Sequence, residues 1–345
     1  MEPLMSMDET GVHLLDDRLM NKLERKKLSP SLINALVDKC HASWLAQSFV
    51  LPEYIEEPED NPRTRGQVFH SVMERFFGYD PVERTKSGIR RAVQETLEED
   101  NYAFAREGEP YEWLTRTVNG YWKLVKTNAE IENAPHEVVL AEVEIEGRKR
   151  SGLELFVTAH LGDAERDTLG FIDRLVMAED GSVIVQDWKT GAKIKRYTGG
   201  PKSQGVDEKR QQFIYGLLLR QLGFEVHTVQ LIFPAAFSQP PRGSNEEPVH
   251  EPGVLTFNLD SEPMFIKRVL EDVETADSML SDIITSNTAT YKPGILCAWC
   301  PLAKLCPAKQ VNIDNAKVMK SYMSQPDADD LLRGIELNTR SGANR

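Results

Sequence analysis

Residues 168–191 read TLGFIDRLVMAEDGSVIVQDWKTG, and their pattern is the strongest indication of the fold. Both halves are rich in β-branched and large apolar residues, which favour strands, and Asp180-Gly181 between them is a turn signal. If the connection is an odd loop centred on Asp180, Asp173 lies opposite Asp187 on the paired strand. Cross-strand neighbours on one face have Cβ atoms about 5 Å apart. The stretch therefore predicts a β-hairpin that brings two carboxylates together.

The chemistry of this hairpin follows from three of its side chains. Asp187 and Lys189 project from one face, because side chains alternate along a strand. Two converging carboxylates are costly unless a cation or a proton neutralises them, and hard oxygen ligands suit Mg²⁺ or Mn²⁺. A metal activates a bound water, while a lysine stabilises the transition state of phosphodiester hydrolysis. The alternative is a solvated strand face with an Asp173-Arg174 surface pair.

Further motifs lie on either side of the hairpin. In chain order the set comprises Gly66-x-x-x-His70, Gly170-Phe171-Ile172-Asp173, Asp187-Trp188-Lys189-Thr190-Gly191 and Gln211-x-x-x-Tyr215. This ordered set resembles the RecB-like branch of the PD-(D/E)XK nuclease superfamily. The resemblance implies an α/β fold with a restriction-endonuclease-like core, in which a mixed central sheet is flanked by helices.

The resemblance also implies roles for the motif residues. The metal ligands would be His70, Asp173, Asp187 and the backbone carbonyl of Trp188, and Lys189 would be catalytic. Gln211 and Tyr215 lie one turn apart on one helix face. The resemblance implies that this face lines the active site and touches DNA or orients the lysine, and helix packing is the alternative. Glu74, one turn after His70, is a candidate to orient the imidazole ring or a plain surface residue.

The four cysteines form a second motif. Cys297-x2-Cys300-x5-Cys306 lies near one end of the chain, and Cys40 lies far earlier. In a long cytosolic chain such cysteines favour metal binding over disulfides, and the spacing alone fits either zinc or a [4Fe–4S] cluster. A remote N-terminal cysteine with this triplet resembles the iron–sulfur nucleases, namely the CRISPR-associated RecB-like exonucleases and the AddB subunit. The resemblance implies a cluster that ties the two ends together, although His41 stands where the family commonly has proline.

Basic residues dominate the segment between the Asp187-Trp188-Lys189 strand and the next helix. Asp207 and Glu208 are the only acids from 190 to 210. Such a rim would attract a phosphate backbone, and an aromatic residue within it would stack on an unpaired base. The alternative is a solvated loop. The candidate DNA contacts are Lys193, Lys195, Arg196, Tyr197, Lys202, Lys209 and Arg210.

The chain has 345 residues, and 54 acidic against 41 basic residues give a formal net charge of −13. This charge argues against non-specific coating of nucleic acid but is compatible with a local basic groove. No apolar run reaches the ~18 residues of a membrane-spanning helix, and the charged N-terminus does not resemble a signal peptide. The sequence therefore predicts a cytoplasmic globular protein.

Hydrophobic periodicity divides the chain into segments. Helices are expected over Leu32–Phe49, which carries Cys40, over Thr64–Phe77, which carries His70, and over about 81–100 and 111–130; strands begin near Glu137. The first half is expected to comprise a flexible N-terminus (1–28), an N-terminal helix and link with the first cysteine (29–62) and a helical region with the His70 motif (63–135). A nuclease core (136–290), a cysteine segment (291–309) and a polar tail (310–345) are expected to follow. The cysteine segment joins the N- and C-terminal segments in a four-cysteine cluster subdomain.

Together these observations predict a metal-dependent DNA exonuclease with Mg²⁺ or Mn²⁺ and a [4Fe–4S] cluster as cofactors. Preference for single-stranded DNA follows from the resemblance alone. Two other classes stay open: an adaptor that processes DNA in a recombination or CRISPR-adaptation complex, and a zinc-stapled protein with a degenerate nuclease fold. Beyond DNA, the partners considered are a second copy of the chain or a protein of such a complex. A role in DNA repair, replication or defence fits equally well.

Overall fold

The computed structural model describes residues 4–49, 59–191, 206–237, 249–293 and 335–337 and the positions 245, 247, 297, 300, 302 and 306–308. The chain forms two compact units. The first comprises residues 1–58, 162–167 and 270–345, and the second comprises residues 59–161 and 168–269.

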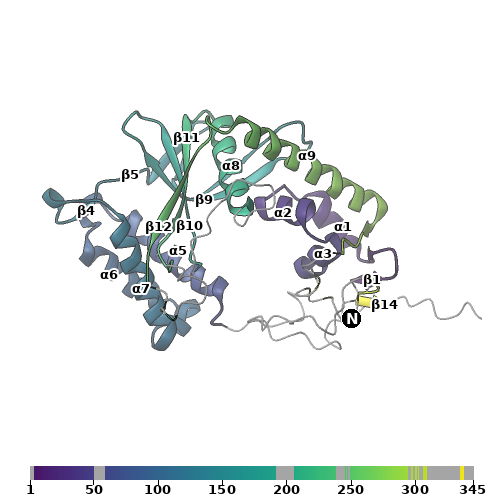
Figure 1. Ribbon diagram of the computed structural model, residues 1–345, viewed down its shortest axis with the longest axis horizontal. Coiled ribbons are helices and arrows are strands. Elements are labelled where there is room, and N and C mark those ends of the chain that lie inside the picture. The colour runs from purple at the N-terminus through teal and green to yellow at the C-terminus, as the bar shows by residue number, and fades with distance from the viewer. Residues whose placement is uncertain are drawn as a thin grey trace, which may run out of the picture. The chain divides into compact units, whose positions relative to one another are not determined.

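The second unit is built on a mixed six-stranded sheet (Figure 1). The strands lie in the order β12 (Gly253–Asn258), β11 (Val226–Phe233), β10 (Val183–Trp188), β9 (Thr168–Met177) and β5 (Val138–Val139), and β8 (Leu153–Ala159) also pairs with β9. β10 and β11 are parallel, whereas the other neighbours are antiparallel. The expected mixed sheet flanked by helices is confirmed.

The β9–β10 hairpin has the register expected from the sequence. Met177 faces Val183 and Arg174 faces Gln186. Continued by one position, this register sets Asp173 opposite Asp187. Gly181 has φ +87°, which only glycine adopts without strain, and the Asp180 carboxylate accepts a hydrogen bond from the Ser182 N–H at 3.0 Å. The turn chemistry therefore fixes which side chains meet across the hairpin.

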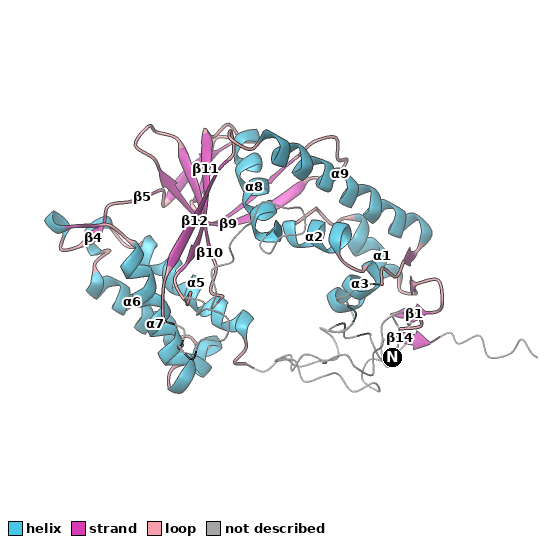
Figure 2. Ribbon diagram, viewed as in Figure 1, coloured by secondary structure: helices cyan, strands magenta, loops and turns pink. Residues whose placement is uncertain are grey.

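Helices cover both faces of this sheet (Figure 2). α5 (Pro62–Gly78), α6 (Lys86–Leu97) and α7 (Gly108–Leu124) enclose an apolar core with Trp188 and Ile232 from one face. α8 (Val206–Gln221) covers the other face, where a Cβ on Gly216 would lie 3.2 Å from Val229 Cγ1. α5 begins at a capping box, in which the Asn61 side chain accepts from the Arg63 and Thr64 N–H groups.

Smaller strand pairs and short helices complete the second unit. They are η1 (Pro81–Glu83), η2 (Asp100–Ala105), β3 (Thr127–Asn128), η3 (Ala129–Ile131), β4 (Ala134–Pro135), β6 (Glu142–Ile145) and β7 (Arg148–Ser151). β3 pairs with β4 and β6 pairs with β7. Glu142 and Glu144 on β6 are exposed.

The first unit contains a four-stranded sheet in the order β13 (Thr288–Ala289), β2 (Val12–Leu14), β1 (Met5–Met7) and β14 (Ile335–Leu337). Its helices are α1 (Asp17–Glu24), α2 (Pro30–Asp38), α3 (His41–Phe49) and the part of α9 (Pro263–Ser286) from Leu270 onward. Segment 162–167 is tied to α9, because the Asp277 carboxylate accepts from the Glu165 N–H at 2.6 Å and pairs with Arg166.

Three sequence expectations differ from this first unit. Segment 1–28, expected to be flexible, contains two strands and a helix. The expected polar tail contains β14, which pairs with β1. Strands of three residues are too short to give a periodic pattern. The single helix expected over Leu32–Phe49 is two helices, because Lys39 is extended at φ −113° and ψ −177° and ends α2. Cys40 therefore lies between helices.

In the described part of the chain no helix has both the length and the apolar content needed to cross a membrane.

Candidate active site

Three side chains from separate elements of the second unit converge to form a candidate metal site. His70 comes from α5, Glu154 from β8 and Asp173 from β9. His70 Nδ1 lies 3.2 Å from Glu154 Oε1 and 3.6 Å from Asp173 Oδ1. One donor atom from each residue lies within 4.8 Å of the other two. We refer to His70, Glu154 and Asp173 as the acidic triad.

Glu154 is the member of the triad that the sequence analysis missed. The register of β8 with β9 pairs Leu153 with Arg174 and Leu155 with Ile172, which sets Glu154 opposite Asp173. Glu154 has φ +47°, a left-handed conformation that costs energy for a residue with a Cβ. The position of an acidic residue between the buried Leu153 and Leu155 was the sequence signal that could have identified Glu154. The pairing itself was not predictable, because it depends on the register of β8 and β9 across the loop that joins them.

The electrostatics of the triad show an excess of negative charge. Burial, reinforced by the nearby Asp187 carboxylate, raises the pKa of Asp173 to about 8. Burial opposes charge on His70, but the Asp173 and Glu154 carboxylates outweigh it and raise the pKa of His70 to about 9. The metal-free site therefore retains protons near neutral pH. A divalent cation would supply the missing positive charge, and one nitrogen with carboxylate oxygens is a donor set that accepts Mg²⁺ or Mn²⁺.

Asp173 and Asp187 are both held rigidly. Asp173 is 9% exposed and Asp187 is 2% exposed. The Trp188 N–H donates to Asp173 Oδ2 at 2.6 Å, which fixes one carboxylate oxygen. The Trp188 ring packs edge-to-face on Phe69 and Tyr121, with ring centroids at 5.8 and 5.4 Å. The end of β10 is thus locked against α5 and α7.

Lys189 belongs to a chain of polar contacts on the same unit. Its Nζ lies 2.7 Å from Asp187 Oδ2 and donates to Gln211 Oε1 at 3.0 Å. Burial opposes its charge, but the Asp187 carboxylate raises the pKa of Lys189. Gln211 Nε2 donates to Asp187 Oδ1 at 3.2 Å and to the Tyr215 hydroxyl at 2.7 Å. The structure therefore brings the two α8 motif residues to the lysine.

The glycines of the motifs allow close approaches at the site. A Cβ on Gly170 would lie 2.8 Å from two ring carbons of Tyr215, closer than real Cβ contacts come. A Cβ on Gly66 would lie 3.3 Å from Thr190 Oγ1. Only glycine lets α8 and β9 approach so closely around Tyr215.

His70 and Glu154 of the acidic triad line a cleft of about 770 Å³. The start of α5 and Asn101 and Tyr102 from η2 form its walls, with Glu154 and Thr190. Glu74 also lines this cleft, but His70 Nδ1 contacts Glu154 instead of Glu74. The contact with His70 for which Glu74 was a candidate is therefore made by Glu154 on β8.

The expected basic rim is only partly described. Lys193, Lys195, Arg196, Tyr197 and Lys202 lie outside the described residues. Lys209 and Arg210 lie within α8 and are buried. Lys209 pairs with Glu262 and its Nζ is 4.4 Å from the Phe265 ring centroid, and Arg210 Nη1 is 3.9 Å from Asp207 Oδ1. These two side chains pack inside the unit, because they lie on the buried face of α8.

The four cysteines all belong to the first unit. Cys40 Sγ accepts from the Lys292 N–H at 3.4 Å, and Cys300 Sγ donates to Ser43 Oγ on α3 at 3.2 Å. Burial raises the pKa of the Cys300 and Cys306 thiols, and the other thiols of the set raise it further. Four half-buried cysteine thiols in one unit are a donor set that suits either zinc or an iron–sulfur cluster.

Comparison with known proteins gives a family match over most of the chain. A family model described as "PD-(D/E)XK nuclease superfamily" matches residues 27–307. No curated protein matches the chain. Among solved structures, a candidate exonuclease from Eubacterium rectale aligns with 11% identity and a TM-score of 0.42 over 86% of this chain and 94% of its own. The structure of SSO0001 aligns with 14% identity and a TM-score of 0.24 over 72% and 86%. The family assignment rests on the family model.

Proposed function

Since this chain belongs to the PD-(D/E)XK nuclease superfamily, we propose that it is a Mg²⁺- or Mn²⁺-dependent deoxyribonuclease that acts as an exonuclease and prefers single-stranded DNA. The convergence of the acidic triad with Asp187 and Lys189 on one unit carries the proposal. His70, Glu154, Asp173 and Asp187 hold the cation, together with the backbone carbonyl of Trp188. A bound divalent cation supplies charge neutralisation and an activated water.

The side chains of this unit divide the remaining work. Lys189 presents an ammonium group, 23% exposed, which stabilises negative charge as it develops on the attacked phosphate. Gln211 holds the lysine amine through its carbonyl oxygen and the Asp187 carboxylate through its amide nitrogen. Tyr215 fixes Gln211 in turn. These contacts restrict the lysine to one orientation before substrate binds.

Two exposed aromatic rings support the preference for single strands. Phe156 on β8 and Phe171 on β9 face each other, with ring centroids 5.0 Å apart, and are 39% and 54% exposed. Each lies two residues from a triad carboxylate, Glu154 or Asp173. Exposed aromatic rings beside a cleavage site offer a stacking surface to unpaired bases. The basic residues of segment 190–202 remain proposed backbone contacts.

We propose a [4Fe–4S] cluster at Cys40, Cys297, Cys300 and Cys306. Cys40 and the C-terminal triplet belong to one unit, and the other three thiols contribute to the raised pKa of Cys306, which supports the proposal. Binding there closes a very long loop, so loss of the cluster would loosen the first unit. A cytoplasmic location, which the sequence predicts, keeps such thiols reduced.

The adaptor hypothesis and the nuclease hypothesis differ in whether this protein itself cleaves DNA. The experiment is degradation of end-labelled single- and double-stranded DNA by anaerobically purified protein in Mg²⁺, Mn²⁺ or EDTA. Asp187→Asn is compared with Glu179→Gln, which removes one exposed charge from the turn of the same hairpin. We expect metal-dependent shortening by wild type and Glu179→Gln, and none by Asp187→Asn. No cleavage by wild type would refute the proposal and favour the adaptor, whereas equal cleavage by Asp187→Asn would show that the active site is misassigned.

A further inference from the structure

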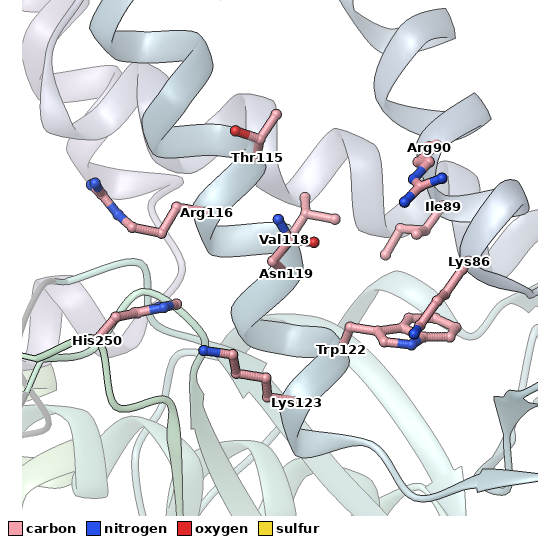
Figure 3. A pocket seen from close by; sticks show the side chains of 10 residues that line it. All are labelled: Lys86, Ile89, Arg90, Thr115, Arg116, Val118, Asn119, Trp122, Lys123 and His250. Carbon is pink, nitrogen blue, oxygen red and sulfur yellow. The ribbon is translucent and has the colours of Figure 1, made fainter.

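A second hollow of the second unit is lined by cations and lies apart from the acidic triad. It has a volume of about 620 Å³ and is formed by α6, α7 and His250 (Figure 3). Lys86 and Arg90 come from the first turns of α6, and Arg116 and Lys123 come from α7. We call Lys86, Arg90, Arg116, Lys123 and His250 the basic hollow.

The charge of the basic hollow is uncompensated. None of the described residues that line it is acidic. Within the described ranges, none of its four lysines and arginines forms an ion pair. Neighbouring arginines behave differently: Arg91 on α6 pairs with Glu83 at 3.1 Å, and Arg75 on α5 pairs with Glu99. Four such cations around one concavity are unexpected in a chain of net charge −13 and indicate an anionic ligand.

The wall between the cations is partly apolar. Trp122 is half-buried and Ile89 and Val118 are buried at the hollow. Figure 3 shows Trp122 between Lys86 and Lys123. Cations around an aromatic and aliphatic surface suit a ligand with phosphates and flat rings, and this volume lies in the range of small-molecule sites.

The position of the hollow favours a long ligand. Lys86 and Arg90 lie at the start of α6, whereas Asn101 and Tyr102, which follow its other end, line the cleft of the acidic triad. α6 has 12 residues and spans about 18 Å. A polynucleotide covers this length, and a mononucleotide does not.

We propose that the basic hollow binds phosphate groups of the polynucleotide substrate about one helix length from the acidic triad. This proposal rests on the proposed function. The hollow holds the strand while its end is cut, so it contributes to affinity and to repeated cleavage of one strand. It takes no part in the chemistry at Asp187 and Lys189.

The test compares two double variants with equal charge change. Arg90→Gln with Lys123→Gln alters the hollow, and Arg91→Gln with Lys149→Gln removes two exposed, ion-paired cations elsewhere on the unit. Binding of a fluorescein-labelled 20-nucleotide strand is measured by anisotropy in EDTA at 50 to 200 mM salt. Two lost phosphate contacts lower the log–log salt slope by about 1.4 for single strands. Raising the salt from 50 to 200 mM should therefore weaken binding by a factor about 7-fold smaller in the hollow variant than in wild type. The control double variant should show the wild-type salt dependence.

The outcomes separate the proposals. Equal affinity and salt slope in both double variants would refute the proposal that the basic hollow binds DNA, even if wild type cuts DNA. An acidic protein would then be the remaining ligand for the hollow. A hollow variant that loses affinity for thymidine monophosphate but keeps that for the 20-mer would overturn the polynucleotide and indicate a product site. If wild type neither binds nor cuts DNA, the proposed function itself fails. The hollow variant should cleave a dinucleotide at the wild-type rate, since a dinucleotide is too short to reach the basic hollow.

Discussion

Glu154→Gln gives the sharpest test of the site, because the sequence motifs do not include Glu154. The substitution keeps the volume and one oxygen but removes one of the two negative charges of the acidic triad. His70 Nδ1 lies 3.2 Å from this carboxylate. Loss of a group that merely orients a ligand typically weakens metal binding about 10- to 100-fold. We expect at least this loss for Mn²⁺.

The expected size of the effect follows from linkage. Wild type at a Mn²⁺ concentration 100 times its Kd gains about 2.7 kcal/mol of stability. A variant with a 100-fold higher Kd gains RT ln 2, about 0.4 kcal/mol. For 345 residues, at about 2.1 cal/mol/K per residue, the Mn²⁺-induced rise in Tm falls from about 4 °C to about 0.6 °C.

The assay is thermal unfolding with and without Mn²⁺, supported by calorimetric titration. Glu74→Gln is the matched control, because Glu74 lines the same cleft without belonging to the acidic triad. It should keep most of the Tm rise. In the metal-free protein, Glu154→Gln should also lower the pKa of His70, which NMR titration reports. An unchanged Kd for Mn²⁺ in Glu154→Gln, or equal losses in both variants, would refute the assignment of Glu154 as a ligand.

Three further predictions concern the same structure. His70 and Asp173 bind protons more tightly in the folded state than in the unfolded state, because their pKa values are raised to about 9 and about 8. The free energy of unfolding of the metal-free protein should therefore fall by on the order of a few kcal/mol as the pH rises from about 4 to 9. Urea unfolding of Asp173→Asn should show a smaller fall, and an equally steep pH dependence would contradict this prediction. Gly170→Ala forces the Tyr215 ring to move and should cost about 1–3 kcal/mol and lower kcat. Gly191→Ala, which meets no described residue within 4 Å, should be neutral. Cys300→Ser should reduce bound iron and visible absorbance and lower Tm, and zinc in place of iron in wild type would identify the zinc-stapled alternative.

Local chemistry made part of the site predictable. The turn at Asp180-Gly181 sets the register of β9 and β10, so Asp173 and Asp187 meet because of residues that are close in sequence. The capping box at Asn61 and the apolar period of α5 likewise follow from neighbouring residues. Such features depend on turn and helix geometry alone, which sequence spacing records.

The β9–β10 hairpin, helix α5 and the residues of the sequence motifs could be identified from the sequence. The position of Glu154 beside His70 and Asp173, the burial of Lys209 and Arg210 and the four cations around one hollow between α6 and α7 are seen only in the folded chain. These outcomes depend on strand register across a long connection and on which helix face packs inward. Both are set by burial of apolar surface among residues far apart in the chain, and no local pattern encodes them.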